Sequence, residues 1–522
     1  MENRHCRSVR QSVKEIVLTT INAKWIHPSL ALRLLKANLG ELEKRCEIIE
    51  FALRQPLGEM LENLLAVRPR ILGISVSIWN HTATVELLAE LHRAWAARTE
   101  RPIIILGGPE VSHLPVSAEI FKNADYVIRG EGEDAFRTLC ENILTSHGYQ
   151  PPRETPQFIN AATVNLETVK SSYHLYTDED LTKKLIYVEA SRGCPFNCEF
   201  CLSAVKSAEG YDTVREFPIE PFLAEMDGLV KRGSAHNGMT FKFLDRTFNL
   251  NIKRALRIIE FFLEKIEERG KLGKKDIVVH FEMVASLFPP ELREILSHFP
   301  PGTLRLEIGI QTLNPEVSAR ICRPSNPEKE LETLRFLREK TNAIIHADLI
   351  AGLPGENLAS FGGGFDRLWL ALCGTETHAT TRRAEIQLGI LKLLPGAPIS
   401  RHSENFAMRY NNLPPYEILE TSAMSARDLT RIKNFARFWE LIINRGLVNF
   451  NEKKQVFENF LTLSDSLFAH FGRNWGIDKN ELLEFIEGQD QPEKCHTGTE
   501  SSEENGFARR KSGSQSLPVT SS

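Results

Sequence analysis

Three cysteines at short spacing are the residues of this sequence best suited to chemistry. Cys194, Cys198 and Cys201 follow one another at intervals of four and three residues. Soft thiolates at such short range select an iron–sulfur cluster, zinc or copper(I) and disfavour oxygen-loving cations. The chain holds 9 cysteines in 522 residues, too few and too unevenly spaced for a disulfide framework. We therefore predict that these three thiolates bind a metal centre.

The number of ligands separates the candidate centres. A structural zinc ion or an electron-transfer cluster normally takes four protein ligands. No fourth cysteine or histidine is near in sequence, because Cys140 and Cys322 are distant and His174 precedes the strand before the loop. An iron–sulfur cluster held by three protein ligands keeps one iron without a protein ligand, and that iron can bind a substrate. Buried structural cysteines and a zinc site completed from afar are the alternatives.

An alternating series of strands and helices must position this loop. Strand patterns occur at residues 185–189, 240–244, 277–282, 303–310, 344–350 and 384–391, with helical patterns between them. Six strands that alternate with helices predict a partial (β/α)6 barrel. Its active site is expected at the carboxyl ends of the strands, where the cysteine loop also lies.

The first 150 residues show the same alternation. Strand patterns occur at residues 16–20, 47–51, 71–78, 103–106 and 126–129. This order predicts an α/β fold with an N-terminal doubly wound parallel sheet and helices on both of its faces. Glycine-bearing turns follow two of the strands, and the carboxyl edge of such a sheet is where ligands bind.

Five segments are predicted along the chain. They are a sheet domain at 14–148, a linker at 149–183, the barrel at 184–412, a helical C-terminal extension at 413–487 and a disordered tail at 488–522. The linker has no clear period, and the tail is poor in apolar residues and rich in Ser, Glu and Gly.

Charge and hydropathy limit the possible partners. The net charge is −4, and Lys and Arg are dispersed, so no broad basic face for nucleic acid is expected. No apolar run approaches the ~18 residues that a membrane helix needs. The start of the chain is too polar for a signal peptide. We expect a cytoplasmic protein that acts away from membranes.

The cysteine loop resembles the signature of the radical S-adenosylmethionine (SAM) superfamily. That signature is Cys-x3-Cys-x2-Cys with an aromatic residue, here Phe200, before the last cysteine. The resemblance implies a 4Fe-4S cluster on Cys194, Cys198 and Cys201, with SAM bound to the open iron. In that family one electron from the reduced cluster cleaves SAM and releases a 5′-deoxyadenosyl radical, which takes hydrogen from the substrate. It also implies an electron donor such as flavodoxin or ferredoxin.

Further segments of the second half resemble the segments of this family that contact SAM. They are 243–249, 307–312 and 348–356, each at the end of a predicted strand. On this resemblance the expected SAM contacts are Phe200, Asp245, Glu307, Gln311, Arg323, Gly352 and Gly355. A tight turn for the two glycines and a buried ion pair for Glu307 are the structural alternatives. The resemblance assigns no catalytic residue on the substrate side.

The first 150 residues resemble the cobalamin (B12)-binding domain of one large subclass. Some members of that subclass also have a C-terminal helical extension of unknown function. The expected cobalamin contacts are Thr20, Asn22, Ser75, Ser77, Gly107, Gly108, Gly130, Glu131 and Gly132. The Asp-x-His-x-x-Gly motif that supplies a cobalt ligand in many cobalamin proteins is missing, so His27 is interpreted as a packing or helix-start residue. A degenerate domain without cobalamin is the alternative.

Three functions are compatible with these features. The first is a radical SAM enzyme with cobalamin, a transferase or rearrangement enzyme acting on an unknown small-molecule or lipid substrate. The second is a methylthiotransferase acting on tRNA or protein, which needs a second cluster in the first domain. Cys6, Cys46 and Cys140 do not sit in the motifs that such a cluster requires. The third is a non-catalytic cobalamin- or metal-binding sensor.

Overall fold

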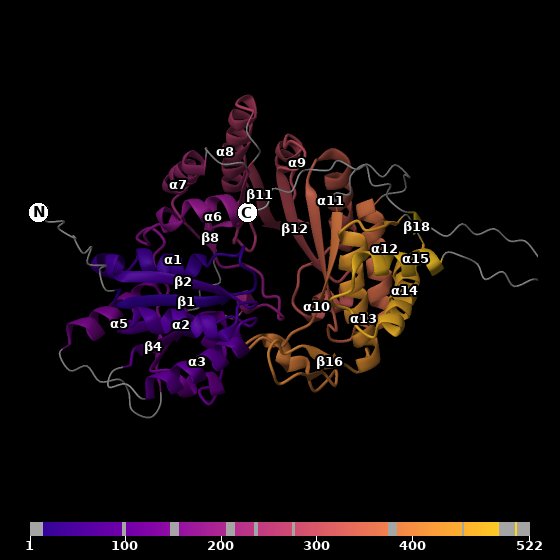
Figure 1. Cartoon of the computed structure of the whole chain (residues 1–522). Helices are drawn as coiled ribbons and strands as arrows, with labels where there is room; N and C mark the ends of the chain where they lie inside the picture. The colour runs from indigo at the N-terminus through magenta and orange to yellow at the C-terminus, as the bar shows by residue number, and fades with distance from the viewer. Residues whose placement is uncertain are drawn as a thin grey trace, which may run out of the picture.

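Two parallel six-stranded sheets and a C-terminal group of helices make up the protein (Figure 1). The computed structural model describes residues 14–96, 101–146, 156–204, 214–233, 238–273, 277–373, 384–450, 454–489 and 507–508. The predicted fold class is confirmed by this arrangement.

The first sheet is parallel, with strand order β2-β1-β3-β4-β5-β6. Its strands are β1 (Ile16–Asn22), β2 (Cys46–Ala52), β3 (Ile71–Ser75), β4 (Ile103–Gly107), β5 (Tyr126–Arg129) and β6 (Gln157–Asn160). Its helices are α1 (Leu30–Ala37), α2 (Leu57–Val67), α3 (His81–Ala96), α4 (Pro109–His113) and α5 (Glu133–Thr145). Apolar side chains of α2 and α3 pack on one face, and those of α1 and α5 pack on the other. Burial on both faces explains the continuous apolar runs of the central strands.

Strand β6 lies inside the predicted linker and extends the first sheet. It pairs with β5, and Gln157 and Asn160 at its two ends are exposed. An edge strand of four residues with polar ends carries almost no periodic signal, which is why the sequence pattern did not reveal it. Helix α6 (Asp178–Lys183) follows and begins with a capping box between Thr177 and Asp180. Residues 147–155, which include the first seven residues of the predicted linker, lie outside the described residues.

The second sheet is also parallel, with order β14-β13-β12-β11-β10-β7. Its strands are β7 (Ile186–Val188), β10 (Met239–Phe243), β11 (Ile277–Met283), β12 (Leu304–Gln311), β13 (Ile344–Ala351) and β14 (Ala384–Ile390). Its helices are α7 (Ile219–Arg232), α8 (Ile252–Lys271), α9 (Pro290–Leu296), α10 (Pro315–Arg320), α11 (Pro327–Lys340) and α12 (Leu358–Cys373). The strands keep their sequence order across the sheet, as expected for a partial barrel.

Side chains of the second sheet alternate between two environments. Phe241, Phe281 and Leu306 are fully buried in the apolar cluster. The alternate positions are half-buried and polar, as in Lys242 and Glu307. Because successive side chains of a strand point to opposite faces, the sheet has one apolar face and one polar inner face.

Helices α13 (Ala426–Trp439), α14 (Val456–Phe471) and α15 (Lys479–Gln489) form the C-terminal part. The indole of Trp439 lies 4.8 Å from the ring of Phe365 in α12, so these helices extend the main core. Two short paired strands lie on either side of the predicted start of the extension at residue 413, β15 (Arg409–Tyr410) before it and β16 (Ile418–Glu420) after it. Two prolines at 414 and 415 prevent a helix between them.

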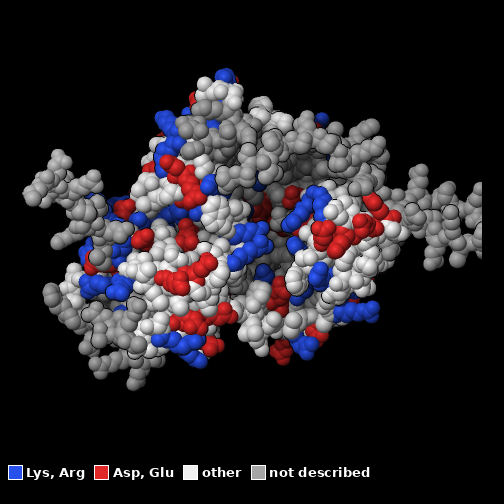
Figure 2. All heavy atoms as spheres, in the orientation of Figure 1, with Lys and Arg blue, Asp and Glu red and all other residues white. Residues whose placement is uncertain are grey.

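The predicted tail is described only in small part. Residues 488 and 489 end α15, and β18 (Phe507–Ala508) pairs with β17 (Asn449–Phe450). Residues 490–506 and 509–522 lie outside the described residues, so the predicted disorder stays a prediction there. No helix within the described ranges is both long and apolar enough to cross a bilayer. On the face drawn in Figure 2, basic and acidic side chains are interspersed.

Candidate functional site

The cysteine loop begins two residues after β7 and runs along the carboxyl end of the second sheet. Cys194, Cys198 and Cys201 are free thiols, of which Cys198 is buried and the other two are half-buried. Gly193 has a φ of +98°, a conformation that glycine adopts without strain and that turns the chain into the loop. The amide of Cys201 donates to the carbonyl of Cys198 at 3.0 Å, which curls the loop.

Glu199, which lies between Cys198 and Cys201, holds the loop to distant parts of the chain. Its carboxylate is 3% exposed and accepts from Nε2 of His402 at 2.7 Å. It also pairs with Arg401, and the thiol of Cys322 lies 3.2 Å from its Oε1. The backbone amide of Ile399 donates to the carbonyl of Glu199 at 3.0 Å. One buried side chain between two of the cysteines therefore joins the loop to two distant segments of the chain.

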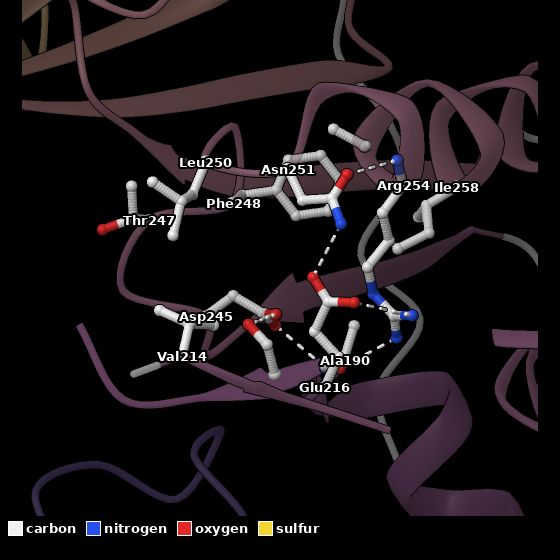
Figure 3. A pocket seen from close by; sticks show the side chains of 12 residues that line it. Ala190, Val214, Glu216, Asp245, Thr247, Phe248, Leu250, Asn251, Arg254 and Ile258 are labelled. Atoms are coloured by element: carbon white, nitrogen blue, oxygen red, sulfur yellow. Dashed lines mark hydrogen bonds and ion pairs between the residues drawn. The ribbon is translucent and has the colours of Figure 1, made fainter. Parts of the chain in front are cut away.

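Asp245 holds the residues that lead into the cysteine loop, next to Ala190 (Figure 3). Its carboxylate accepts from the amide of Ala190 at 3.0 Å and from the hydroxyl of Ser191 at 2.5 Å. Burial raises the pKa of Asp245 to about 6, and these two hydrogen bonds offset part of the rise. The hydroxyl of Thr247 lies 3.6 Å from the sulfur of Cys194. As it lies here, Asp245 positions the loop, and its predicted contact with SAM stays a prediction.

A small pocket lies next to Asp245. It is bounded by the segment after β10, the start of α8 and the two short strands β8 (Ser191–Arg192) and β9 (Arg215–Glu216). Arg254 crosses it and donates through Nη2 to the carbonyls of Ala190 and Phe217 at 2.9 and 2.7 Å. Asp245 and Arg254, which line the pocket, both bond to Ala190 and so fix the segment that leads into the loop.

Arg323 brings a positive charge to the cysteine loop. Its Nη1 lies 4.0 Å from the sulfur of Cys198, and its Nη2 donates to the carbonyl of Gly309. Burial raises the pKa of Cys198, and the guanidinium offsets part of that rise. Gln311 follows Gly309 at a bulge and has a φ of +67°. The structure thus brings together Cys198, Gln311 and Arg323, three of the predicted site residues.

The polar inner face of the second sheet lies beside this group. Glu307 pairs with Nζ of Lys242 at 3.0 Å and with Nε2 of His280 at 3.2 Å. These contacts, the one with His280 first, lower the pKa of Glu307 to about 2. Asp348 has no hydrogen-bond partner for Oδ1. Burial, with the nearby charges of Glu307 and Glu282, raises the pKa of Asp348 to about 8.

Sequence reasoning did not assign Lys242, His280 or Glu282 to the site, and it included Asp348 only as part of segment 348–356. A signal was present, because polar residues alternate with apolar ones in several strands, as with Thr240 and Lys242 in β10 and His280 and Glu282 in β11. Read across neighbouring parallel strands, that alternation marks a shared polar face.

The remaining predicted SAM contacts hold structural positions. Gly352 and Gly355 have φ values of +90° and +80°. A Cβ at Gly352 would lie 2.6 Å from Ile418, and one at Gly355 would lie 2.4 Å from Arg320. Phe200 is half-buried against the main core. The two glycines are thus required by close packing, and the contacts of all three residues with SAM stay predictions.

The predicted cobalamin residues gather at the carboxyl edge of the first sheet. They are Thr20, Asn22, Ser75, Ser77, Gly107, Gly108, Gly130, Glu131 and Gly132, at or after the ends of β1, β3, β4 and β5. A Cβ at Gly108 would lie 2.5 Å from the carbonyl oxygen of Val76, so only glycine fits there. Asn80, which the sequence did not single out, is fully buried and donates to the hydroxyl of Thr20 at 3.1 Å.

Exposed apolar side chains occupy the same edge. Trp25, Leu53 and Trp79 follow β1, β2 and β3 and are 47%, 41% and 52% exposed. Large aromatic side chains in water are the usual mark of a surface that another molecule covers. His27 donates to or accepts from the hydroxyl of Tyr187 at 2.8 Å, and burial lowers its pKa. It therefore packs against β7, as the sequence interpretation holds.

The donor set fits an iron–sulfur cluster. Three unpaired thiols share one loop, with a guanidinium next to one of them. Within the described residues, no three His, Cys, Asp or Glu side chains converge on one point as a single metal ion requires. A 4Fe-4S cluster takes one thiolate on each of several irons, and three free thiols on one loop can supply such a donor set.

Comparison with known proteins gives two family matches. Residues 188–365 match the model of the Radical SAM superfamily, and residues 16–140 match that of the B12 binding domain. The chain is 25% identical over 371 residues to the cobalamin-dependent radical SAM methyltransferase TokK of Streptomyces tokunonensis, over 66% of this chain and 50% of that protein. It is 29% identical over 248 residues to the ribosomal protein uS12 methylthiotransferase RimO of Methylibium petroleiphilum, over 44% and 50%. The chain thus spans about half the length of these curated relatives.

Among solved structures, the cobalamin-dependent S-adenosylmethionine radical enzyme OxsB with aqua-cobalamin and S-adenosylmethionine bound is similar to this chain. The match covers 91% of this chain and 70% of that one, with a TM-score of 0.54 and 16% identity. At this identity the likeness shows a shared fold.

Proposed function

The chain belongs to the radical SAM superfamily and carries a B12 binding domain, and from this premise we propose its activity. We propose that it cleaves SAM reductively at a 4Fe-4S cluster and uses cobalamin to transfer a methyl group, or to rearrange a small-molecule substrate. The observation that carries this proposal is the loop of three unpaired thiols at the carboxyl end of the second sheet. The electron donor, a flavodoxin or ferredoxin, and a cytoplasmic location belong to the same proposal.

In the second sheet, the residues at and around the cysteine loop would have two separate roles. Cys194, Cys198 and Cys201 would hold the cluster, which when bound supplies one electron and an open iron for SAM. Glu199 would hold the loop through His402, and Asp245 would hold the residues just before the loop through the amide of Ala190.

On the inner face, Asp348 offers a polar group for a bound cofactor. With a pKa of about 8, it keeps its proton at neutral pH. Its unpartnered Oδ1 can then exchange hydrogen bonds with a ligand without placing a second charge beside Glu307.

The first sheet would hold cobalamin at its carboxyl edge. Gly108 keeps the backbone close to β3, and Trp25 and Trp79 offer apolar surface for a flat macrocycle. The sequence has no Asp-x-His-x-x-Gly motif, so we propose binding without a histidine ligand from that motif.

Anaerobic reconstitution with iron and sulfide, followed by SAM and dithionite, tests the proposal. The protein should turn brown and form 5′-deoxyadenosine, and a separate titration with hydroxocobalamin should shift the cobalamin spectrum. Cys198→Ala should abolish the cluster absorbance and the cleavage. Cys373→Ala, which removes an exposed thiol at the end of α12, should change neither. A cluster-loaded protein that never forms 5′-deoxyadenosine would leave the sensor hypothesis standing.

The methylthiotransferase hypothesis is weaker. It needs a second cluster on cysteines of the first domain, where Cys46 and Cys140 are both buried in one apolar cluster. Burial raises the pKa of Cys46 to about 12, so this thiol stays protonated and unsuited to iron. Cys6 lies outside the described residues.

A further inference from the structure

Two arginines on the β8–β9 ribbon reach from the cysteine loop to the first sheet. Arg192 and Arg215 are register partners in this antiparallel ribbon, so their side chains leave it on the same side. Arg192 lies two residues before Cys194, the first cysteine of the loop. The ribbon is therefore a direct extension of the candidate cluster site.

Carboxylates of the first sheet receive both arginines. Nη2 of Arg192 pairs with Glu133 at 2.7 Å, and Nη1 lies 3.7 Å from Glu131. Its Nε also pairs with Glu189 of its own segment at 3.0 Å. Arg215 takes Glu131 with both terminal nitrogens, one of them at 3.2 Å. Glu131 lies in the turn between β5 and α5, and Glu133 is the first residue of α5, at the carboxyl edge where the cobalamin contacts are predicted.

The pair of Arg192 with Glu133 is shielded from water, whereas the side chains of Arg215 and Glu131 are 24% and 25% exposed. The side chains of Arg192 and Glu133 are 11% and 8% exposed. Exposed ion pairs contribute little to stability, whereas removing one partner of a buried pair leaves an uncompensated charge. Loss of either Arg192 or Glu133 would therefore leave a buried charge without its partner.

Glu131 has no free oxygen for a ligand in this arrangement. Beyond its two contacts with Arg215, its Oε2 accepts from the amide of Val164 at 2.9 Å. The predicted cobalamin contact of this side chain therefore competes with its role in joining the two halves.

We propose that Arg192 is a positioning residue that couples occupation of the first sheet's carboxyl edge to the position of the cysteine loop. The role of the coupling in catalysis rests on the proposed function, but the coupling itself does not. A ligand that binds Glu133 or Glu131 pulls these carboxylates away from the arginines and shifts the ribbon. Cys194 follows the ribbon by two residues and shifts with it. The device would keep a methyl donor on one domain aligned with the radical source on the other.

The first test measures amide hydrogen exchange in the full-length protein without cofactors. Glu133→Gln should raise exchange in residues 189–196 by about tenfold, and Arg192→Gln should raise it in residues 129–136 by a similar factor. In the double variant the two effects should not add, because both remove the same contact. Arg137→Gln breaks an exposed pair with Asp134 on the same helix and should leave residues 189–196 unchanged.

Wild-type exchange at 189–196 in Glu133→Gln, or additive effects in the double variant, would overturn the proposal. Should Arg192→Gln not fold, Arg192→Lys and Glu133→Gln still carry the test, since Lys keeps the charge but not the forked geometry.

A second measurement separates this proposal from the proposed function. Hydroxocobalamin should lower exchange at residues 189–196 in the wild type and have a clearly smaller effect in Arg192→Gln. Equal protection in both would overturn the coupling while supporting cobalamin binding. Absence of any cobalamin spectrum in the wild type would contradict the cobalamin part of the proposed function, and the first test would still decide the coupling.

Discussion

Glu199 is the residue whose replacement most directly tests how the cysteine loop is held. Glu199→Gln keeps the size of the side chain and removes its charge. The lost interaction with His402, at 2.7 Å and with both side chains nearly buried, is a charge-assisted hydrogen bond worth about 1.5–3 kcal/mol. The pair with Arg401 adds little, because that arginine is 60% exposed and solvent screens it. We therefore expect Glu199→Gln to lower the free energy of unfolding by about 2–3 kcal/mol.

Urea titration of the cofactor-free protein, followed by circular dichroism, measures this loss. Glu404→Gln, an exposed carboxylate close to the same segment, is the matched control and should change stability by less than ~0.5 kcal/mol. Iron bound per chain after reconstitution should also fall in Glu199→Gln. The reasoning is refuted if Glu199→Gln unfolds at the same urea concentration as the control and binds as much iron.

Three other substitutions have expected outcomes. The pKa of Asp348 is raised to about 8 in the fold, so the free energy of unfolding should fall as pH rises from about 4 to 8. Asp348→Asn should reduce the steepness of this fall by up to ~1.4 kcal/mol per pH unit, as measured by urea titrations at several pH values. Gly352→Ala should destabilise by roughly 2 kcal/mol, since φ is +90° and the new Cβ would meet Ile418, whereas Gly363→Ala in α12, with open space around it, should be neutral or stabilising in the same thermal melts. Asn80→Ala should lower the affinity for hydroxocobalamin in a visible titration, because it frees the turn after β3; unchanged affinity would show that this turn does not bind the cofactor.

The order and type of the main elements could be predicted from the sequence. Eleven of the strands that the structure shows follow apolar runs bounded by helical patterns, and parallel sheets buried between helices produce that signal. Strand β6 could not be predicted, because a four-residue edge strand with polar ends has no period of its own. The short pair β15 and β16 was missed for the same reason.

The candidate site could be predicted only where it is local in sequence. Three cysteines within eight residues are visible in the sequence. The residues that hold the loop in place come from distant segments. Glu199 meets Cys322 and His402 at separations of 123 and 203 residues, which no pattern along one chain reveals. The polar inner face had a readable signal in the alternation of the strands. The individual contacts to SAM and cobalamin remain predictions.

Electron paramagnetic resonance of the anaerobically reconstituted, dithionite-reduced protein tests the central claim most directly. We expect the signal of a reduced four-iron cluster that changes when SAM is added, since SAM would bind the iron that has no cysteine ligand. A zinc-loaded protein without such a signal, or a cluster signal that SAM leaves unchanged, would contradict it.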